Sequence, residues 1–366
     1  MLRRGVCSRN VAGMRTLIVA AGRFDEALAE RIATGREPRL DVFELQRALG
    51  ADLIDYRAVD ASRSLAVRAV RRSLGHSAAA AVIAAQLSPR YHVIFATGED
   101  IGIPLALQLK ARRSRTAHAM IAHTLTPVKK RAFFRLGIAS HIGRILCYSS
   151  NEERYMLERL RLPAPKVRRI YFHADDRFFR PSTLPPEPDL VCSAGQLLRD
   201  YDLLIRAAAG LGVRLHIAAG SPWISSQLRP SAPLPDGVEW RRYDRFGLRE
   251  LYARAAVAVV PIIQNEYQTG IATILEMMAM GKCVITTRTR GQTDTIQDGV
   301  TGIYVPPGDP DALRAALQRL LSHPEEAQRI GAAARRFVET EANLDRFVER
   351  VACAVRDACS APSSTQ

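Results

Sequence analysis

The stretch that decides the fold reads Val257-Ala-Val-Val-Pro-Ile-Ile-Gln-Asn-Glu-Tyr-Gln-Thr-Gly-Ile-Ala-Thr-Ile-Leu-Glu-Met-Met-Ala-Met-Gly-Lys-Cys-Val-Ile-Thr-Thr287. An apolar run that is typical of a buried strand comes first, and a polar loop follows it. An apolar helical run over 271–280 and a second strand-like run over 283–287 complete the stretch. Because glycine stands directly before and directly after the helical run, the order predicts a strand, a loop, a helix and a strand.

The beginning of the predicted helix is a candidate anion site. The first N–H groups of a helix have no partner within the helix, and the helix dipole adds positive charge at the same end. Gly270 would let a phosphate approach the backbone closely. We therefore expect a diphosphate-bearing ligand at Gly270, Ile271 and Thr273, with Glu276 accepting a hydrogen bond from a sugar hydroxyl.

Charge is distributed unevenly along the chain, whose net charge is +15. Residues 1–180 hold 32 Lys and Arg against 16 Asp and Glu, whereas residues 181–366 hold 20 against 21. Residues 101–150 carry nine basic residues and no acidic one. Such a one-sided field favours an anionic partner such as lipid headgroups, a polyanionic substrate or nucleic acid. The alternative is an arginine-rich proteome with drifted surface residues.

Length and composition indicate a globular protein of two domains. The chain has 366 residues, of which 47% are hydrophobic and 24% charged, enough for two cores. No apolar run reaches the roughly 18–20 residues that a membrane span needs. The six cysteines form no C-x-x-C pair, which argues against a metal knuckle and fits a reducing cytoplasm.

Both ends of the chain lack a fold signal. Residues 1–14 contain three arginines and no signal-peptide core, so we expect a disordered lead-in, with either Met1 or Met14 as the start. We also expect a disordered tail over 360–366.

Residues 15–180 alternate between strand and helix signals. Strands are expected over 16–20, 51–56, 91–97, 117–123 and 142–149, and helices over 40–49, 65–87, 105–110 and 129–138. Alternation of this kind predicts an N-terminal domain with a doubly wound parallel sheet.

A proline-rich linker over 181–189 separates this domain from a second one. The alternation restarts with a strand over 190–194, and the second domain extends from 190 to 343. We consider that the last helix, 344–359, returns to the N-terminal domain.

Two such sheets would leave a cleft between the carboxyl ends of their strands, where ligands of open α/β sheets bind. The loop that follows the strand at 190–194 would face this cleft. In it, Gly195 permits close approach of the backbone, and Arg199 would be a fixed cation for a phosphate. The alternative is a plain turn with Arg199 and Asp200 on the surface.

These motifs resemble the retaining glycosyltransferases of the GT-B fold, the large family-four group that uses nucleotide-diphosphate sugars. Leu-Glu-Met-Met-Ala-Met-Gly-Lys-Cys-Val-Ile at 275–285 and Asp-Gly-Val-Thr-Gly-Ile-Tyr-Val-Pro-Pro-Gly-Asp at 298–309 carry the resemblance most specifically. The segments 194–201 and 171–181 add to it. The resemblance runs from about residue 90 to 350, and it implies GT-B architecture with two Rossmann-like domains facing a central cleft.

The resemblance assigns roles in the second domain by position. Glu276 matches the second of two family glutamates, which binds the nucleotide ribose. The first glutamate, which contacts the transferred sugar, falls on Gln268, an uncharged residue that can still donate and accept hydrogen bonds. Where the family often has an arginine after the first strand of this domain, the chain has Gln196, and a cation stands only at Arg199. Because of these departures, the identity of the transferred sugar and the contacts to the leaving group stay open. A degenerate, inactive member of the family is the alternative.

In the first half, the resemblance points to His123 and Gly22. His123 ends a strand where the family often presents a histidine near the reacting sugar, so we treat His123 and Gln268 as the catalytic candidates. A strand-end histidine without a role is the alternative. Gly22 lies in the first loop, where the family places a glycine near the donor phosphates. Glu99 and Asp100 are expected to touch the acceptor or to be solvated loop acids.

The segment 127–135 mixes cations with aromatic side chains. On a basic amphipathic helix that lies on an anionic membrane, each cation would contribute about 1 kcal/mol. The residues of this candidate surface are Lys129, Lys130, Arg131, Phe133 and Phe134. The alternative puts both phenylalanines in the core and the cations in water.

We therefore expect a retaining glycosyltransferase that moves a sugar from a nucleotide-diphosphate sugar to an acceptor hydroxyl. The acceptor is expected to be a lipid or another anionic molecule, with the protein in the cytoplasm or peripheral on the inner face of the cell membrane. No metal or cofactor beyond the co-substrate is expected, because helix amides and Arg199 can neutralise the leaving diphosphate. The alternatives are a noncatalytic nucleotide-sugar binder, a sugar-nucleotide epimerase of this fold and, with no stacking motif to support it, a nucleic-acid-binding protein.

Overall fold

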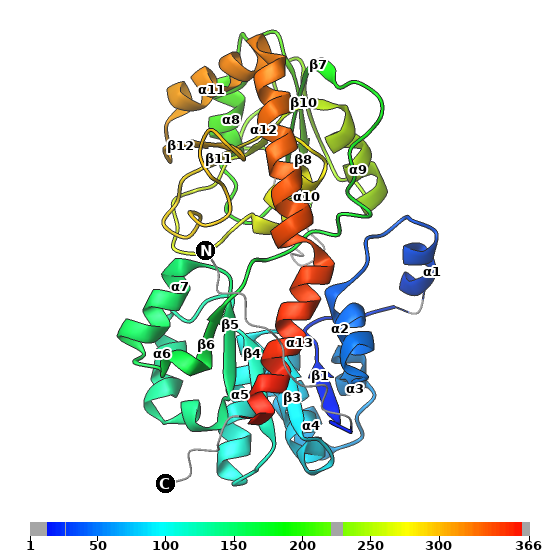
Figure 1. Ribbon diagram of the computed structural model, residues 1–366, viewed down its shortest axis with the longest axis vertical. Helices are drawn as coiled ribbons and strands as arrows, with labels where there is room; N and C mark the ends of the chain where they lie inside the picture. The colour runs from blue at the N-terminus through cyan, green and yellow to red at the C-terminus, as the bar shows by residue number, and fades with distance from the viewer. Residues whose placement is uncertain (1–12, 26, 221–229, 361–366) are drawn as a thin grey trace. The chain divides into compact units, whose positions relative to one another are not determined.

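The computed structural model describes residues 13–25, 27–220 and 230–360. The expected lead-in, apart from its last two residues, and the expected tail beyond residue 360 lie outside this range. The chain forms two compact units, each with its own parallel sheet and with helices on both sides of that sheet (Figure 1). Unit 1 contains residues 1–28, 40–170 and 347–366, and unit 2 contains residues 29–39 and 171–346.

The sheet of unit 1 has six parallel strands in the order β2-β1-β3-β4-β5-β6. The order reverses between β1 and β3, which makes a switch point at the carboxyl ends of these two strands. The strands are β1 (Thr16–Val19), β2 (Asp52–Ile54), β3 (Val93–Ala96), β4 (Ala117–Ile121), β5 (Arg144–Cys147) and β6 (Val167–Arg169). The helices are α2 (Asp41–Leu49), α3 (Tyr56–Asp60), α4 (Leu65–Leu87), α5 (Glu99–Ala111), α6 (Val128–Arg135) and α7 (Ser150–Arg154), with short 3₁₀ or π turns at Ser88–Arg90, Ile138–His141, Tyr155–Arg159 and Ala164–Lys166.

The sheet of unit 2 also has six parallel strands, in the order β12-β11-β10-β7-β8-β9. This is the order of dinucleotide-binding sheets, with the switch point between β7 and β10. The strands are β7 (Glu187–Ala194), β8 (Arg214–Ala218), β9 (Val238–Arg241), β10 (Ala255–Val260), β11 (Val284–Thr287) and β12 (Ile303–Val305). The helices are α8 (Tyr201–Ala208), α9 (Arg245–Arg254), α10 (Ile271–Ala279), α11 (Pro310–Ser322) and α12 (Pro324–Phe337), with a π turn at Val338–Ala342.

The sheet of unit 2 is buried on both faces because helices cover both of them, and alternate residues of each strand point to opposite faces. In β10, Val257 and Val259 pack in one apolar cluster with side chains of α8 and α11. Ala258 and Val260 pack in the other cluster with side chains of α9 and α10. A continuous apolar run such as 255–260 is what a strand covered on both faces requires, so the expected α/β class with two doubly wound parallel sheets is confirmed.

Two helices connect the units along the chain. The first segment of unit 1 ends at Leu28, the first residue of α1 (Leu28–Ala33), and α13 (Leu344–Ser360) begins in unit 2 and continues into unit 1. In unit 1, the Arg356 side chain of α13 donates to the carbonyl oxygen of Ala48 at 3.2 Å. The expected linker over 181–189 lies within unit 2, because the second segment of that unit begins at Tyr171 and β7 begins at Glu187.

Candidate functional site

Two loops meet at the carboxyl edge of the unit 2 sheet, at the switch point between β7 and β10. The N–H of Asp200 donates to the carbonyl oxygen of Pro261 at 3.1 Å, and the N–H of Ile263 donates to that of Leu198 at 3.0 Å. The loop after β7 therefore runs beside the loop after β10. This is the place at which open α/β sheets bind ligands.

The helix α10 begins in the second of these loops without a side-chain cap. Gly270, which precedes it, has a φ of +82°, in the left-handed region that favours glycine. The N–H groups of Ile271, Ala272 and Thr273 meet no hydrogen-bond acceptor among the residues that the structure describes. In contrast, an aspartate caps each of α8, α9 and α11. The start of α10 thus presents free N–H groups where the sequence pattern puts an anion.

The guanidinium of Arg199 lies against this helix start. It donates to the carbonyl oxygens of Ala194 (3.0 Å) and Leu197 (2.8 Å) and to Oγ1 of Thr273 (3.4 Å). The residue is 7% exposed, and burial lowers its pKa. Within the described part of the chain, no carboxylate pairs with it. A buried cation without a counter-charge is costly, and a bound anion would supply that charge.

The two glycines named from the sequence make room for this guanidinium. Gly195 has a φ of +99°, and a Cβ at this position would overlap the guanidinium of Arg199. A Cβ on Gly270 would lie 3.2 Å from both terminal nitrogens of the same group. The structure therefore brings Gly195, Arg199, Gly270 and Thr273 together in one cationic site.

Glu276 lies in the second turn of α10 and is 8% exposed. Its Oε1 accepts from Nη1 of Arg245 at 3.0 Å, and its Oε2 accepts from the hydroxyl of Tyr252 at 3.4 Å. Burial raises the pKa of Glu276, and the charge of Arg245 only partly opposes this. Sequence reasoning missed Arg245, which begins α9 after the capping residue Asp244.

Gln268 lies in the loop that leads into α10. Its Nε2 donates to Oγ1 of Thr295 at 3.3 Å, whereas its Oε1 is buried without a partner among the described residues. Gln292, which is fully buried, donates to the carbonyl oxygen of Thr269 at 3.4 Å and also leaves its Oε1 unpaired. Buried polar atoms of this kind call for a ligand or a water as partner. The loop after β11 thus contributes a second carboxamide that sequence reasoning did not name.

In unit 1, Gly22 and His123 lie on loops at the carboxyl edge of the sheet. Gly22 has a φ of +133°, and its carbonyl oxygen accepts from the N–H of Tyr56 at 2.9 Å. The ring of His123 is exposed, and its Nε2 lies 3.3 Å from the carbonyl oxygen of Thr97. Because a carbonyl can only accept, the neutral ring carries its proton on Nε2.

Glu99 differs from the expectation of a solvated loop acid. It is the first residue of α5 and is 3% exposed, whereas Asp100 is exposed. Its carboxylate accepts from the N–H of His123 at 2.8 Å and from Nζ of Lys130 at 2.6 Å. The expectation is therefore wrong for Glu99, because donors from two other segments converge on its carboxylate.

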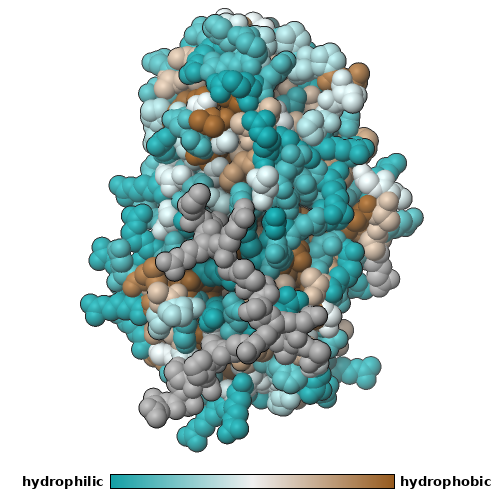
Figure 2. All heavy atoms as spheres, in the orientation of Figure 1, coloured by the Kyte–Doolittle hydropathy of each residue, from teal (hydrophilic) through white to brown (hydrophobic). Residues whose placement is uncertain are grey.

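The expected membrane-facing set on α6 is corrected at two positions. Phe134 is buried at 8% exposure, and Lys130 is engaged by Glu99, so neither is available to a membrane. Apolar side chains lie among polar ones at the left edge of the molecule in Figure 2, where Figure 1 labels α6. The apolar side chains that α6 and the next residue expose are Val128 (73%), Phe133 (37%) and Leu136 (59%), with Lys129 exposed and Arg131 half-buried.

Among the described residues, no three His, Cys, Asp or Glu side chains are grouped so that they could hold a metal ion. No helix in this part of the chain is long and apolar enough to cross a membrane. Cys147, Cys192 and Cys283 are buried, and burial raises the pKa of the last two thiols to about 12.

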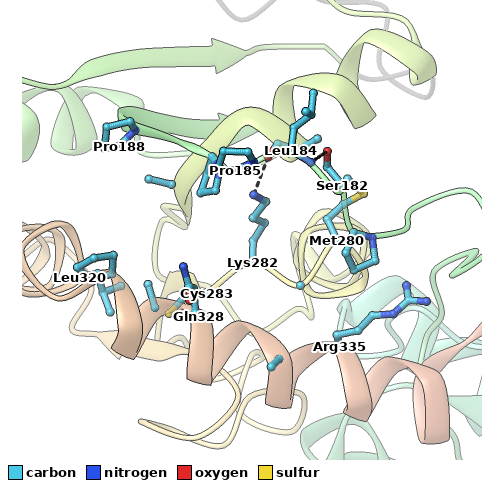
Figure 3. Close-up of a pocket in the computed structure, with 18 of the residues that line it drawn as sticks. Ser182, Leu184, Pro185, Pro188, Met280, Lys282, Cys283, Leu320, Gln328 and Arg335 are labelled. Carbon is cyan, nitrogen blue, oxygen red and sulfur yellow. Dashed lines mark hydrogen bonds between the residues drawn. The ribbon is translucent and has the colours of Figure 1, made fainter.

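A separate pocket of about 560 Å³ lies at the opposite, amino-terminal edge of the unit 2 sheet (Figure 3). Pro188 near the start of β7, Ala256 near the start of β10 and Cys283 before β11 line it. The side chain of Lys282 points toward Leu184 and Pro185 in Figure 3 and donates to the carbonyl oxygens of Ala253 and Ala255. The pocket contains none of the site residues named from the sequence.

Comparisons with known proteins find glycosyltransferases. Residues 190–323 match the family model of the glycosyl transferases group 1. A D-inositol 3-phosphate glycosyltransferase of Nocardiopsis dassonvillei is 27% identical, and the match covers 59% of this chain and 48% of that protein. An alpha-D-kanosaminyltransferase of Streptomyces kanamyceticus is 24% identical, with 63% of this chain and 64% of that protein covered. The match thus spans about half to two thirds of the length of these relatives.

Solved structures show the same fold. The crystal structure of a glycosyltransferase from Rickettsia africae ESF-5 has a TM-score of 0.69 at 15% identity and covers 94% of this chain and 98% of its own. The structure of Anabaena Alr3699/HepE in complex with UDP-glucose has a TM-score of 0.66 at 13% identity and covers 93% and 98%.

Proposed function

We propose that this chain, which belongs to the group 1 glycosyl transferases of the GT-B fold, transfers a sugar from a nucleoside-diphosphate sugar to an acceptor hydroxyl with retention of anomeric configuration. Unit 2 binds the donor, and unit 1 binds the acceptor. The observation that carries the proposal is the buried guanidinium of Arg199, which has no carboxylate partner among the described residues and lies against the uncapped start of α10.

Different site residues bind different parts of the donor. The N–H groups at the start of α10 and Arg199 bind the diphosphate, and Glu276 accepts from the ribose hydroxyls. Gln268 orients the transferred sugar, and His123 of unit 1 is the second residue that we propose as catalytic. The bond from the anomeric carbon to the phosphate oxygen breaks, the bond to the acceptor oxygen forms, and the acceptor proton passes to the leaving diphosphate. The positive charge of Arg199 stabilises that leaving group without a metal ion.

A panel of nucleoside diphosphates tests the proposal. The protein would be heated with UDP, GDP, ADP, CDP and dTDP, and with the corresponding nucleoside monophosphates. A ligand present at 100 times its Kd stabilises the folded state by about 2.7 kcal/mol, so at least one diphosphate should raise the melting temperature by several degrees. If no nucleoside diphosphate shifts the transition, the proposed donor site is wrong.

Gln268 favours a second candidate function, the binding of a nucleotide sugar without turnover. The carboxamide replaces an acid in the family pattern, and its oxygen has no partner among the described residues. Both candidates predict the same nucleotide affinity. Release of nucleoside diphosphate from UDP-glucose, GDP-mannose and ADP-glucose separates them, because only an enzyme turns over a donor. Activity that survives EDTA supports the metal-independent form of the transferase.

The acceptor proposal rests on the exposed side of α6. Val128, Phe133 and Leu136 are apolar and exposed beside Lys129, a combination that suits the surface of an anionic membrane. We propose that the protein binds such a surface peripherally and there meets a lipid or another anionic acceptor.

A further inference from the structure

The loop after β4 is held by two buried carboxylates from two different helices. Oε2 of Glu99 accepts from the N–H of His123 at 2.8 Å, and Oε1 accepts from the N–H of Thr124 at 3.3 Å. Oε2 of Glu152 accepts from the next N–H, that of Leu125, at 3.1 Å. Three successive backbone donors are therefore bound by side chains of α5 and α7 rather than by water.

Both carboxylates are fixed by their own helices. Glu99 is the first residue of α5 and is 3% exposed. Glu152 is 2% exposed, and its N–H donates to Oγ of Ser149, the cap of α7. Acids in the first turn of a helix are stabilised by the helix dipole. The two anchors are thus set by helix starts at the carboxyl edge of the sheet.

Lys130 completes the arrangement around Glu99. Its Nζ lies 2.6 Å from Oε1 of Glu99 and 3.3 Å from the carbonyl oxygen of Thr124. Burial works against the ionised form of Glu99, but the fields of His123 and Lys130, together with the hydrogen bonds, lower its pKa. The carboxylate therefore stays charged, and it binds backbone N–H groups more strongly than a neutral group would.

The anchored backbone orients the side chain of His123. Because the N–H groups of His123 and Thr124 are both bound by Glu99, the peptide planes on both sides of the His123 Cα are held, and with them the direction of its Cα–Cβ bond. The ring is then held by the carbonyl oxygen of Thr97, 3.3 Å from Nε2, and by the ring of Tyr148, whose centroid is 5.5 Å away. Nδ1 is left for another partner.

We propose that Glu99 is a positioning residue for sugar transfer, which holds the 123–125 loop and thereby His123, and that Lys130 keeps Glu99 in its charged, anchoring form. The inference rests on the proposed function, because it assumes that His123 is a catalytic residue. It assigns the Lys130 side chain to the ion pair with Glu99 rather than to a membrane surface.

The test compares Glu99→Gln, Lys130→Met and Lys130→Arg, with Arg135→Met as the control for an exposed cation on the same helix. The readouts are the kcat for release of nucleoside diphosphate from the donor that the wild type uses, and the Kd for the matching nucleoside diphosphate. A displacement of about 1 Å can cost about 100-fold in rate, so kcat should fall by up to about 100-fold in Glu99→Gln and less in Lys130→Met. Lys130→Arg, which restores the charge, should recover most of the rate, and the control should match the wild type.

The Kd for the nucleoside diphosphate should stay unchanged in all four variants, because the residues proposed to bind it lie in unit 2. A general loss of folding would lower kcat and also weaken binding of the nucleoside diphosphate, so the Kd would rise in the same variants. Wild-type kcat in both Glu99→Gln and Lys130→Met overturns the positioning role.

Hydrogen exchange of the amides of residues 123–125 gives a readout that needs no donor. Glu99→Gln should exchange the amides of His123 and Thr124 at least tenfold faster than the wild type, and Arg135→Met should not. If the exchange rates stay at the wild-type level, the anchor itself is refuted. If the wild type turns over no sugar nucleotide, the proposed transferase activity fails, whereas the exchange experiment still decides on the anchor.

Discussion

Replacement of Arg199 by methionine should separate ligand binding from stability. Methionine fills a similar apolar volume but brings neither the charge nor the donors of the guanidinium. In the free protein, the variant removes a buried cation that has no carboxylate partner among the described residues, which favours folding. It also removes the donors to the carbonyl oxygens of Ala194 and Leu197, at a cost of about 1 kcal/mol each. We therefore expect the free energy of unfolding to stay within about 2 kcal/mol of the wild-type value.

Binding should respond much more strongly. A hydrogen bond to a charged group contributes about 1.5–3 kcal/mol, and every 1.4 kcal/mol is a factor of ten in Kd. The Arg199→Met variant should therefore bind the preferred nucleoside diphosphate roughly 10- to 140-fold more weakly by titration calorimetry. The corresponding nucleoside should bind as it does to the wild type, because Arg199 lies at the start of α10 and not at Glu276.

The matched control is Arg206→Met, which removes an exposed arginine from α8. It should leave both the Kd and the melting temperature unchanged. An unchanged Kd for the diphosphate in Arg199→Met would refute the reasoning. An equal loss for the nucleoside and the diphosphate would also refute it, since the effect would then not depend on phosphate.

Three further results are expected. Gly270 has a φ of +82°, so Gly270→Ala should lose about 1–2 kcal/mol of stability and should bind the diphosphate at least tenfold more weakly by calorimetry. The control Gly281→Ala, at a φ of +72°, should show only the loss of stability. Equal affinities of the two variants for the diphosphate would contradict the placement of the phosphate. Because burial raises the pKa of Glu276 above its ordinary 4.5, the wild type should lose stability relative to Glu276→Gln as pH rises from below 4.5 through that raised pKa; urea unfolding at pH 4 and pH 7 measures this, and a relative gain at pH 7 would refute it. Sedimentation with phosphatidylserine vesicles should fall at least tenfold when Lys129→Glu and Arg131→Glu are combined, given about 1 kcal/mol for each cation; unchanged sedimentation removes the membrane proposal.

The local motif at 257–287 predicted the strand, loop and helix that form the candidate site. Its periodicity and its two flanking glycines are local properties, so the strand, the loop and the start of α10 could be read from the sequence. The proximity of Arg199 to Gly270 followed from the rule that ligands bind where strand order reverses. The structure places the two residues together although 70 residues separate them.

The interactions that the sequence did not reveal are tertiary. Arg245 reaches Glu276 from another helix, and nothing in the segment 244–254 distinguishes this arginine from its solvated neighbours. The pairing of Glu99 with Lys130 was missed for the same reason. One local signal was available, because Glu99 and Asp100 directly after Gly98 are typical of a helix start, and α5 indeed begins at Glu99.

The prediction of which α6 residues face a membrane was wrong at two positions, because tertiary contacts decide which face of the helix is buried. Positions 130 and 134 are four residues apart and share one face. That face turns inward, so that Phe134 is buried and Lys130 reaches Glu99. The neighbouring positions 129 and 133 lie on the other side and stay exposed. Composition alone could not show which of the two faces would be buried.

A structure of the protein with a bound nucleoside diphosphate tests the central claim most directly. Phosphate oxygens should lie about 2.7–3.2 Å from the N–H groups of Ile271 to Thr273 and from the guanidinium of Arg199. A diphosphate that binds elsewhere, with those N–H groups facing water or other protein atoms, would contradict the account.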